Sequence, residues 1–291
     1  MAVTSITGDA PSVPAGNATL REKATGANDL RLTWRLFPGR LVGFGLNLLF
    51  FIVCFQVYKL ARKTFITGGD TVGCDPIHPI AACKHAEQII GWQKNVHLFF
   101  EPRLQAWILD RPHFVIQGLN YYYVAFMPLF YSCCGLAMLF GPVQWRFWRR
   151  MFLASMVIAL PWYAIYPLAP PRFMPQYGFI DTLMKYGPSY FSSNGLVSAN
   201  QYAAMPSMHI GWSTIAGLML ATCIPRWRGF PIGAVVGVLH ICLMTLVVMA
   251  TANHYFFDEL GGWTVDLAAL LVAWKLVDRI PFGFPRWMNP V

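Results

Sequence analysis

The feature that most constrains this chain is a series of long apolar segments, each close to the length needed to cross a bilayer. A transmembrane helix requires about 20 mostly apolar residues. Six segments approach or reach that length: 39–58, 118–140, 151–168, 205–223, 231–251 and 260–277. Hydrophobic residues make up 56% of the 291 residues and charged residues only 12%, which is unlike an ordinary soluble domain. The sequence therefore predicts an all-α, polytopic membrane protein with about six transmembrane helices in a bundle.

The net charge of +9 at first suggests a nucleic-acid partner. No cationic helix, zinc-finger spacing or aromatic-basic patch supports that function, so we expect no nucleic acid. Basic clusters without an acid instead occupy the short loops predicted at 141–150 and 224–230. Cytoplasmic loops of membrane proteins accumulate Lys and Arg. This pattern predicts that both termini are cytoplasmic, with Lys59, Arg62 and Lys63 as a local exception, and we expect the plasma membrane as the location.

The predicted spans divide the chain into a tail and one membrane domain. Residues 1–30 are rich in Ala, Thr, Gly and Ser without apolar periodicity, which predicts a disordered cytoplasmic tail. Residues 31–291 show no internal repeat and are expected to form a single domain. In the first outside loop, 61–114, the apolar pattern at 86–109 approximates helix spacing but is interrupted by charges. This pattern favours one or two interfacial helices lying on the membrane surface.

Cys74 and Cys83 are the two cysteines of this first outside loop. If the topology is right, both face an oxidising compartment, where they either form a disulfide across a short loop or remain two free thiols.

Polar residues gather at the outer ends of three predicted spans. Three prolines end the span at 151–168 and place Arg172 at the outer surface. His209 lies near the start of the span at 205–223, and His254 follows the span at 231–251. A short basic turn joins these two spans, so we expect an antiparallel pair that brings both histidines to the extracytoplasmic side.

These residue types suit the handling of a phosphate group. Asp258 is four residues after His254, so its carboxylate can accept one ring N–H and leave the other ring nitrogen as a nucleophile. His209 can give a proton to a departing alkoxide. Pro206 in a first helical turn, with Ser207 beside it and Arg172 nearby, can hold phosphate oxygens. The predicted catalytic residues are His254, His209 and Asp258, and the predicted phosphate-binding residues are Arg172 and Ser207.

Each residue also has a purely structural interpretation. His209 can pack between helices, His254 and Asp258 can be a structural hydrogen-bonded pair, Arg172 can extend to lipid headgroups, and Ser207 can be a helix cap. Their joint placement at three helix ends favours the enzyme, working through a phosphohistidine. The alternative of another class is a non-enzymatic transporter or lipid-binding protein, although transporters place ionisable groups near the midplane. A histidine nucleophile with a cationic clamp requires no metal and no cofactor.

At these positions the chain resembles the type 2 phosphatidic acid phosphatase superfamily, whose motifs are KxxxxxxRP, PSGH and SRxxxxxHxxxD. The stretch 206–209, Pro-Ser-Met-His, is similar to the second motif, and 254–258, His-Tyr-Phe-Phe-Asp, to the end of the third. Arg172 resembles the arginine of the first. Phe173 stands where that motif has Pro, Ile165 where it has Lys, and Val247-Val248 where the third has Ser-Arg.

The form PSxH with HYxxD looks more like the branch that contains inositol phosphorylceramide synthases and sphingomyelin synthases. This resemblance covers residues 115–278, the expected catalytic core. It implies a lipid phosphate ester as substrate, two His and one Asp as catalytic residues, and an alcohol that can replace water as acceptor. We therefore expect a lipid phosphotransferase that moves an inositol-phosphate-like head group, or a plain lipid-phosphate phosphatase. The sequence leaves the lipid and the oligomeric state open.

Overall fold

The computed structural model describes residues 30–65, 74, 80–187 and 202–276. Within these residues the regular structure is helical, and the only β features are two isolated bridges, Leu168–Ala203 and Trp227–Phe230. The predicted all-α class is therefore confirmed. The predicted tail lies outside the described residues except for Leu30, which begins the first helix.

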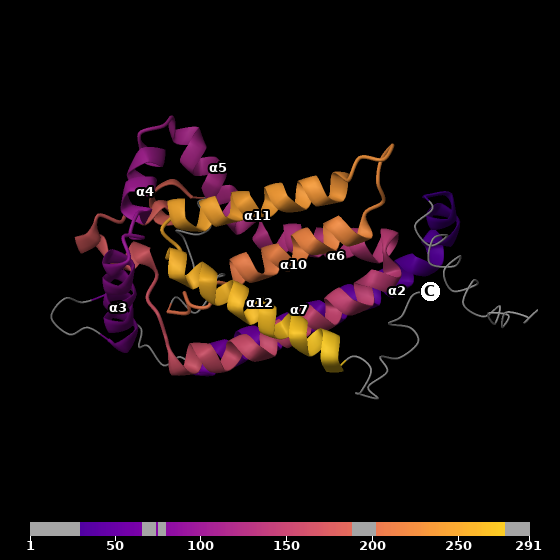
Figure 1. The fold of residues 1–291 in the computed structure, drawn as a ribbon, viewed down its shortest axis with the longest axis horizontal. Helices are drawn as coiled ribbons and strands as arrows, with labels where there is room; N and C mark the ends of the chain where they lie inside the picture. Colours follow the sequence, from indigo (N-terminus) through magenta and orange to yellow (C-terminus); the bar gives the residue numbers. More distant parts are fainter. Residues whose placement is uncertain (1–29, 66–73, 75–79, 188–201, 277–291) are drawn as a thin grey trace, which may run out of the picture.

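Six helices form an elongated bundle along the long axis of the molecule (Figure 1). They are α2 (Leu30–Phe65), α6 (Phe126–Phe140), α7 (Pro142–Ile165), α10 (Met208–Cys223), α11 (Ile232–Ala250) and α12 (Phe256–Leu276). Trp212 of α10 lies in their core, with its ring centroid 5.0 Å from that of Phe152 and its Nε1 donating to Ser155 Oγ over 3.1 Å. The core is thus built from large aromatic side chains around one satisfied indole N–H.

A second layer covers one end of the bundle, at the left in Figure 1. It contains α3 (Ala81–Asn95), α4 (Glu101–Leu109), α5 (His113–Val124), the short helices η1 (Pro171–Phe173) and η2 (Pro175–Tyr177), and α8 (Thr182–Tyr186). The expectation of one or two helices within 86–109 is confirmed as two helices. We call α3, α4 and α5 the outer layer.

Glycines allow α10 and α11 to pack closely as an antiparallel pair. A Cβ atom on Gly237 would lie 2.3 Å from the backbone oxygen of Gly217, and one on Gly233 would lie 2.1 Å from that of Leu220. Gly217 of α10 lies against Gly237 of α11, and Leu220, further along α10, lies against Gly233, earlier in α11. The two helices therefore run antiparallel, as predicted. Small residues at such a crossing let two backbones touch.

Two predicted segments differ from the structure. The prediction of one continuous helix over 118–140 is wrong, because α5 and α6 meet at Ala125 with a bend of 56°. Pro128 lies in the first turn of α6, and a proline ring clashes with the carbonyl four residues earlier, so the preceding helix ends at Val124. The prediction of a basic loop at 141–150 is also wrong, because α7 begins at Pro142. Only Gly141 separates α6 from α7, and Arg149 is a buried helical residue that donates to Asn47 Oδ1 over 3.1 Å.

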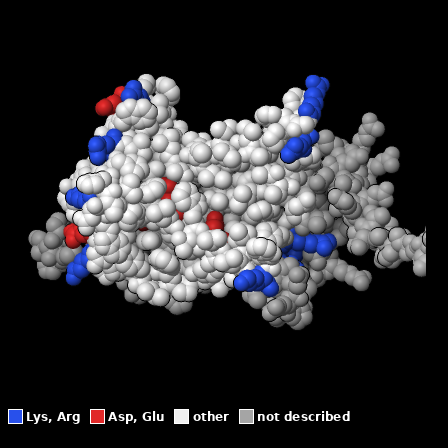
Figure 2. Space-filling view, in the orientation of Figure 1, with Lys and Arg blue, Asp and Glu red and all other residues white. Residues whose placement is uncertain are grey.

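The surface carries features of a lipid-facing bundle. On the face drawn in Figure 2, most of the Lys and Arg side chains lie toward the two ends, and few lie between them. Large apolar side chains are exposed along α2, α11 and α12: Leu49, Val53, Val57, Val236, Leu239, Leu267 and Leu271. Among the described residues, α11 is the one helix long and apolar enough to cross a membrane by itself, and the bent pair α5 and α6 is a second if counted as one span. The number of six spans stays a prediction.

We expect Gly237→Ala to destabilise the helix pair, because the added Cβ meets the backbone of Gly217 and cannot be relieved by a side-chain rotation. Overpacking of this kind costs about 1–3 kcal/mol, which predicts a clearly lower Tm of the detergent-purified protein. Gly91→Ala in α3 is the matched control, since a Cβ there meets nothing within 4 Å. Equal Tm values for the two variants would contradict the close packing.

Candidate active site

The structure brings together the two histidines that the sequence placed at the ends of different helices. His209 lies in the first turn of α10, and His254 lies in the connection between α11 and α12. His209 Nδ1 is 3.3 Å from His254 Nε2, and the two ring centroids are 5.4 Å apart. The rings are close enough to contact one phosphate group together.

The hydrogen bonds of His254 fix its tautomer. Its Nδ1 is 2.9 Å from the backbone oxygen of Ala204 and 3.4 Å from Asp258 Oδ2. A carbonyl oxygen only accepts hydrogen bonds, so Nδ1 must carry the proton. In the neutral ring the lone pair is then on Nε2, the nitrogen that faces His209.

A backbone hydrogen bond at Asp258 joins the stretch 206–209 to the stretch 254–258. Asp258 lies fully buried in the first turn of α12, where its Oδ2 accepts the Tyr255 N–H over 2.9 Å. The Ser207 N–H donates over 2.9 Å to the backbone oxygen of Asp258. This approach requires a glycine on α12, because a Cβ on Gly262 would lie 2.3 Å from the Ser207 oxygen. The register between α10 and α12 is therefore set directly at the site.

Aromatic rings hold the other histidine. The His209 ring stacks on Tyr123 with a centroid distance of 4.5 Å and an interplanar angle of 26°, and it contacts Phe126 at 4.7 Å. These two residues flank Ala125, where α5 and α6 bend. The sequence analysis did not predict this contact.

Ser207 occupies the N-cap position of α10, but its side chain makes no capping hydrogen bond. Pro206 precedes this cap, so its predicted place in the first helical turn is wrong. Ser207 is fully buried, and its Oγ has no hydrogen-bond partner among the described residues. Leaving a buried hydroxyl unpaired costs about 1–3 kcal/mol. An oxygen of a bound phosphate would satisfy it.

Arg172 lies in η1, beside the residue that precedes His254. The backbone N–H of Arg172 donates to the backbone oxygen of Ala252 over 2.9 Å. In the side chain, Nη1 donates to Asn253 Oδ1, and Nε is 3.7 Å from Asp181 Oδ2. Asn253 is held in turn by Thr251, to whose Oγ1 its Nδ2 donates over 2.7 Å. The guanidinium is thus held beside Asn253, the residue that precedes His254. The sequence analysis did not assign a role to Asn253 or Asp181.

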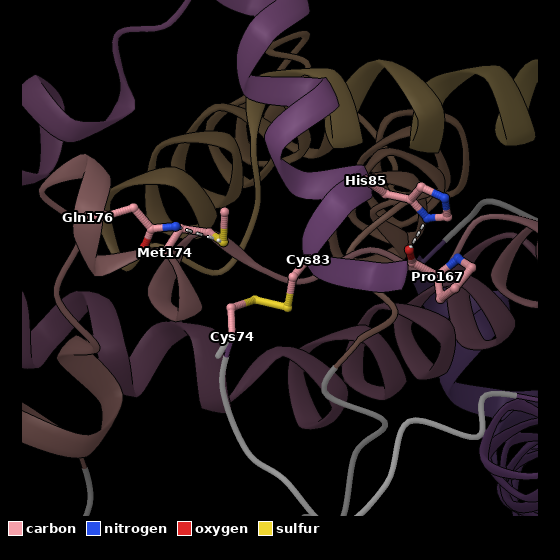
Figure 3. The surroundings of a disulfide bond; sticks show 6 residues. All are labelled: Cys74, Cys83, His85, Pro167, Met174 and Gln176. Carbon is pink, nitrogen blue, oxygen red and sulfur yellow. Dashed lines mark hydrogen bonds between the residues drawn. A yellow bond between two sulfur atoms is a disulfide. The ribbon is translucent and has the colours of Figure 1, made fainter. Parts of the chain in front are cut away.

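Helix α3 supports the segment that leads to Arg172. Cys74 and Cys83 form a disulfide at its start, which settles the alternative left open by the sequence (Figure 3). His85 Nδ1 is 2.7 Å from the backbone oxygen of Pro167, and the Ala169 N–H donates to Ala82 O over 3.0 Å. Leu168 then pairs with Tyr202 and Ala204 by backbone hydrogen bonds. The outer layer is therefore connected to the carbonyl that orients His254.

Comparison with known proteins agrees with these motifs. Residues 87–272 match the PAP2 superfamily, and because this region is more than half of the chain, the chain belongs to that superfamily. It is 27% identical over 191 residues to the inositol phosphorylceramide synthase catalytic subunit aur1 of Schizosaccharomyces pombe. The aligned part covers 60% of this chain but 42% of that relative, so the chain matches less than half of its length. No solved structure matches.

We expect Arg172→Ala to weaken inhibition by orthovanadate, a phosphate analogue, because the variant lacks the guanidinium at the edge of the site. A hydrogen bond to a charged group contributes about 1.5–3 kcal/mol, which corresponds to roughly a 10- to 150-fold higher inhibition constant. Arg103→Ala is the matched control, since Arg103 is exposed on α4. An unchanged inhibition constant in the Arg172 variant would remove this residue from the phosphate site.

Proposed function

We propose that this protein is a membrane-embedded enzyme that cleaves a lipid phosphate ester through a phosphohistidine intermediate. One observation carries the proposal. His254 has its proton fixed on Nδ1 by the Ala204 carbonyl, and its Nε2 faces His209. A fixed imidazole with a directed lone pair is what attack on phosphorus requires, and a second imidazole beside it can move protons.

In the first step His254 Nε2 attacks the phosphorus, and the bond from phosphorus to the leaving alkoxide breaks. Protonated His209 gives its proton to that oxygen, so the lipid departs as an alcohol. The direct contact between the two rings opens when the phosphate group enters. Arg172, the Ser207 hydroxyl and the first N–H groups of α10 hold the phosphate oxygens. Asp258 stabilises the positive charge that develops on His254.

In the second step His209 takes a proton from the acceptor. The acceptor oxygen attacks phosphorus, the phosphorus–nitrogen bond breaks, and His254 returns to its neutral form. An alcohol as acceptor gives a new phosphodiester, whereas water gives a free phosphate product. The similarity to the catalytic subunit of an inositol phosphorylceramide synthase favours transfer of an inositol-phosphate-like head group to an alcohol. Hydrolysis of a lipid phosphate is the alternative.

We also propose that the site lies at the extracytoplasmic face of the plasma membrane, with both termini in the cytoplasm. The support is chemical. The Cys74–Cys83 disulfide belongs to the same end of the molecule as the histidine pair, because α3 is bonded to the segment that leads to Arg172. Disulfides persist in oxidising compartments and are rare in the cytosol.

Trapping of the intermediate tests the mechanism. With a labelled phosphate ester whose leaving group needs no proton, we expect His209→Gln to accumulate label on His254, because it still allows attack but slows the second step. His254→Gln should take up no label and lose at least about 10³-fold in turnover, as expected for a missing nucleophile. His113→Gln, at the exposed start of α5, is the control. Full turnover by the His254 variant would refute the proposal.

A product assay decides between the two acceptors. Phosphatidylinositol carrying ³²P is incubated with the purified enzyme in the presence and absence of ceramide as a lipid alcohol, and phosphatidic acid is tested separately. A transferase gives a new labelled phosphodiester only when the alcohol is present. A phosphatase releases inorganic phosphate from phosphatidic acid regardless of the alcohol. Products that form equally with His254→Gln would come from a contaminant.

A further inference from the structure

Glu101 is a buried carboxylate that the proposed mechanism does not use. It belongs to the first turn of α4 in the outer layer, and it is fully inaccessible to solvent. Its Oε1 accepts the backbone N–H of Phe256 over 2.9 Å and a hydrogen bond from Gln93 Nε2. Burial raises the pKa of this carboxyl, and the nearby Asp258 acts in the same direction, whereas the Gln93 and Phe256 bonds lower it. A carboxylate in such a place is costly unless donors are supplied.

Phe256 is the first residue of α12, so its N–H is one of the groups that a helix start leaves without an internal partner. Asp258 accepts the preceding N–H, that of Tyr255. Two carboxylates from different elements therefore hold two successive N–H groups immediately after His254. Negative groups at a helix start are also favoured by the helix dipole.

Residues in the corner between α3 and α4 hold Glu101 in position to accept the Phe256 N–H. Gln93, in the last turn of α3, donates to both Leu98 O, over 3.0 Å, and Glu101 Oε1. The Phe100 ring, adjacent to Glu101, packs against Phe256 at a centroid distance of 5.9 Å. Gln93 is itself fully buried. The contact with α12 is thus made by a preassembled corner rather than by a single extended side chain.

We propose that Glu101 is a positioning residue for the His254–Asp258 pair, acting through the backbone at Phe256. The inference rests on the proposed function of His254. Glu101 acts through the Phe256 N–H and is not proposed to contact the phosphate or the reacting atoms. It fixes the start of α12, and with it the direction in which Asp258 reaches back to His254. A displaced catalytic group can cost about 10²-fold in rate without affecting binding.

Two substitutions separate geometry from charge. Glu101→Gln keeps an acceptor oxygen at the same distance and removes the charge, so kcat should stay close to that of the wild type. Glu101→Asp keeps the charge but is one methylene too short for the Phe256 N–H, so kcat should fall by about 10- to 100-fold with KM nearly unchanged. Glu87→Asp, at an exposed position on α3, is the matched control and should behave as wild type.

Wild-type kcat in Glu101→Asp, or an equal loss in Glu101→Gln, would overturn the inference. If Glu101→Asp does not fold, Gln93→Met removes the amide that holds Glu101, and it should lower kcat in the same direction but less. Wild-type kcat in that variant would also overturn it. His254→Gln is assayed in parallel. If it retains turnover, the proposed function fails, whereas an inactive His254 variant with a normal Glu101→Asp refutes the positioning role alone.

Discussion

The arrangement of the site depends on one hydrogen bond, from the His254 ring to the Ala204 carbonyl. A carboxyl group can accept a hydrogen bond from a ring nitrogen or, when protonated, donate one to it, but a carbonyl oxygen only accepts and requires a proton on the nitrogen that faces it. The carbonyl is in turn held in place, since Ala204 N–H donates to Leu168 O and Ala169 is bonded to α3. The protonation pattern of the histidine is therefore set by backbone geometry rather than by a mobile side chain.

The outer layer contributes to the site on both sides. Glu101 reaches the start of α12, while Gln105 and Asn120 bind the backbone at Ile180 and Thr182, on either side of the Asp181 that faces Arg172. All three side chains are buried, so their polar groups must be paired and cannot easily exchange partners. The layer thus contacts the segments that carry both the histidine pair and Arg172. This explains how a site at the end of a helix bundle is kept rigid.

The helical class and the meeting of His209 with His254 could be predicted because apolar length and short turns are local properties of a sequence. The spacing of His254 and Asp258 likewise encoded a contact. Glu101, in contrast, was visible only as a charge interrupting an interfacial helix, since its partner is 155 residues away and no periodicity reports such a pairing. The predicted span at 118–140 runs through Pro128, but the ring of this proline ends α5, and Tyr123 near that end stacks on His209. The roles of the site residues stay predictions.

The hydrogen bond from the Phe256 N–H to Glu101 also affects the order in which the site can form during synthesis of the chain. The two residues leave the ribosome 155 positions apart, so α4 is made long before the backbone group that it must hold. Before α12 is made, the Glu101 carboxylate lacks the backbone N–H that it accepts in the folded protein, and the contact between the His209 and His254 rings cannot form. The geometry of the site can therefore be completed only late in synthesis, when α12 packs against the outer layer.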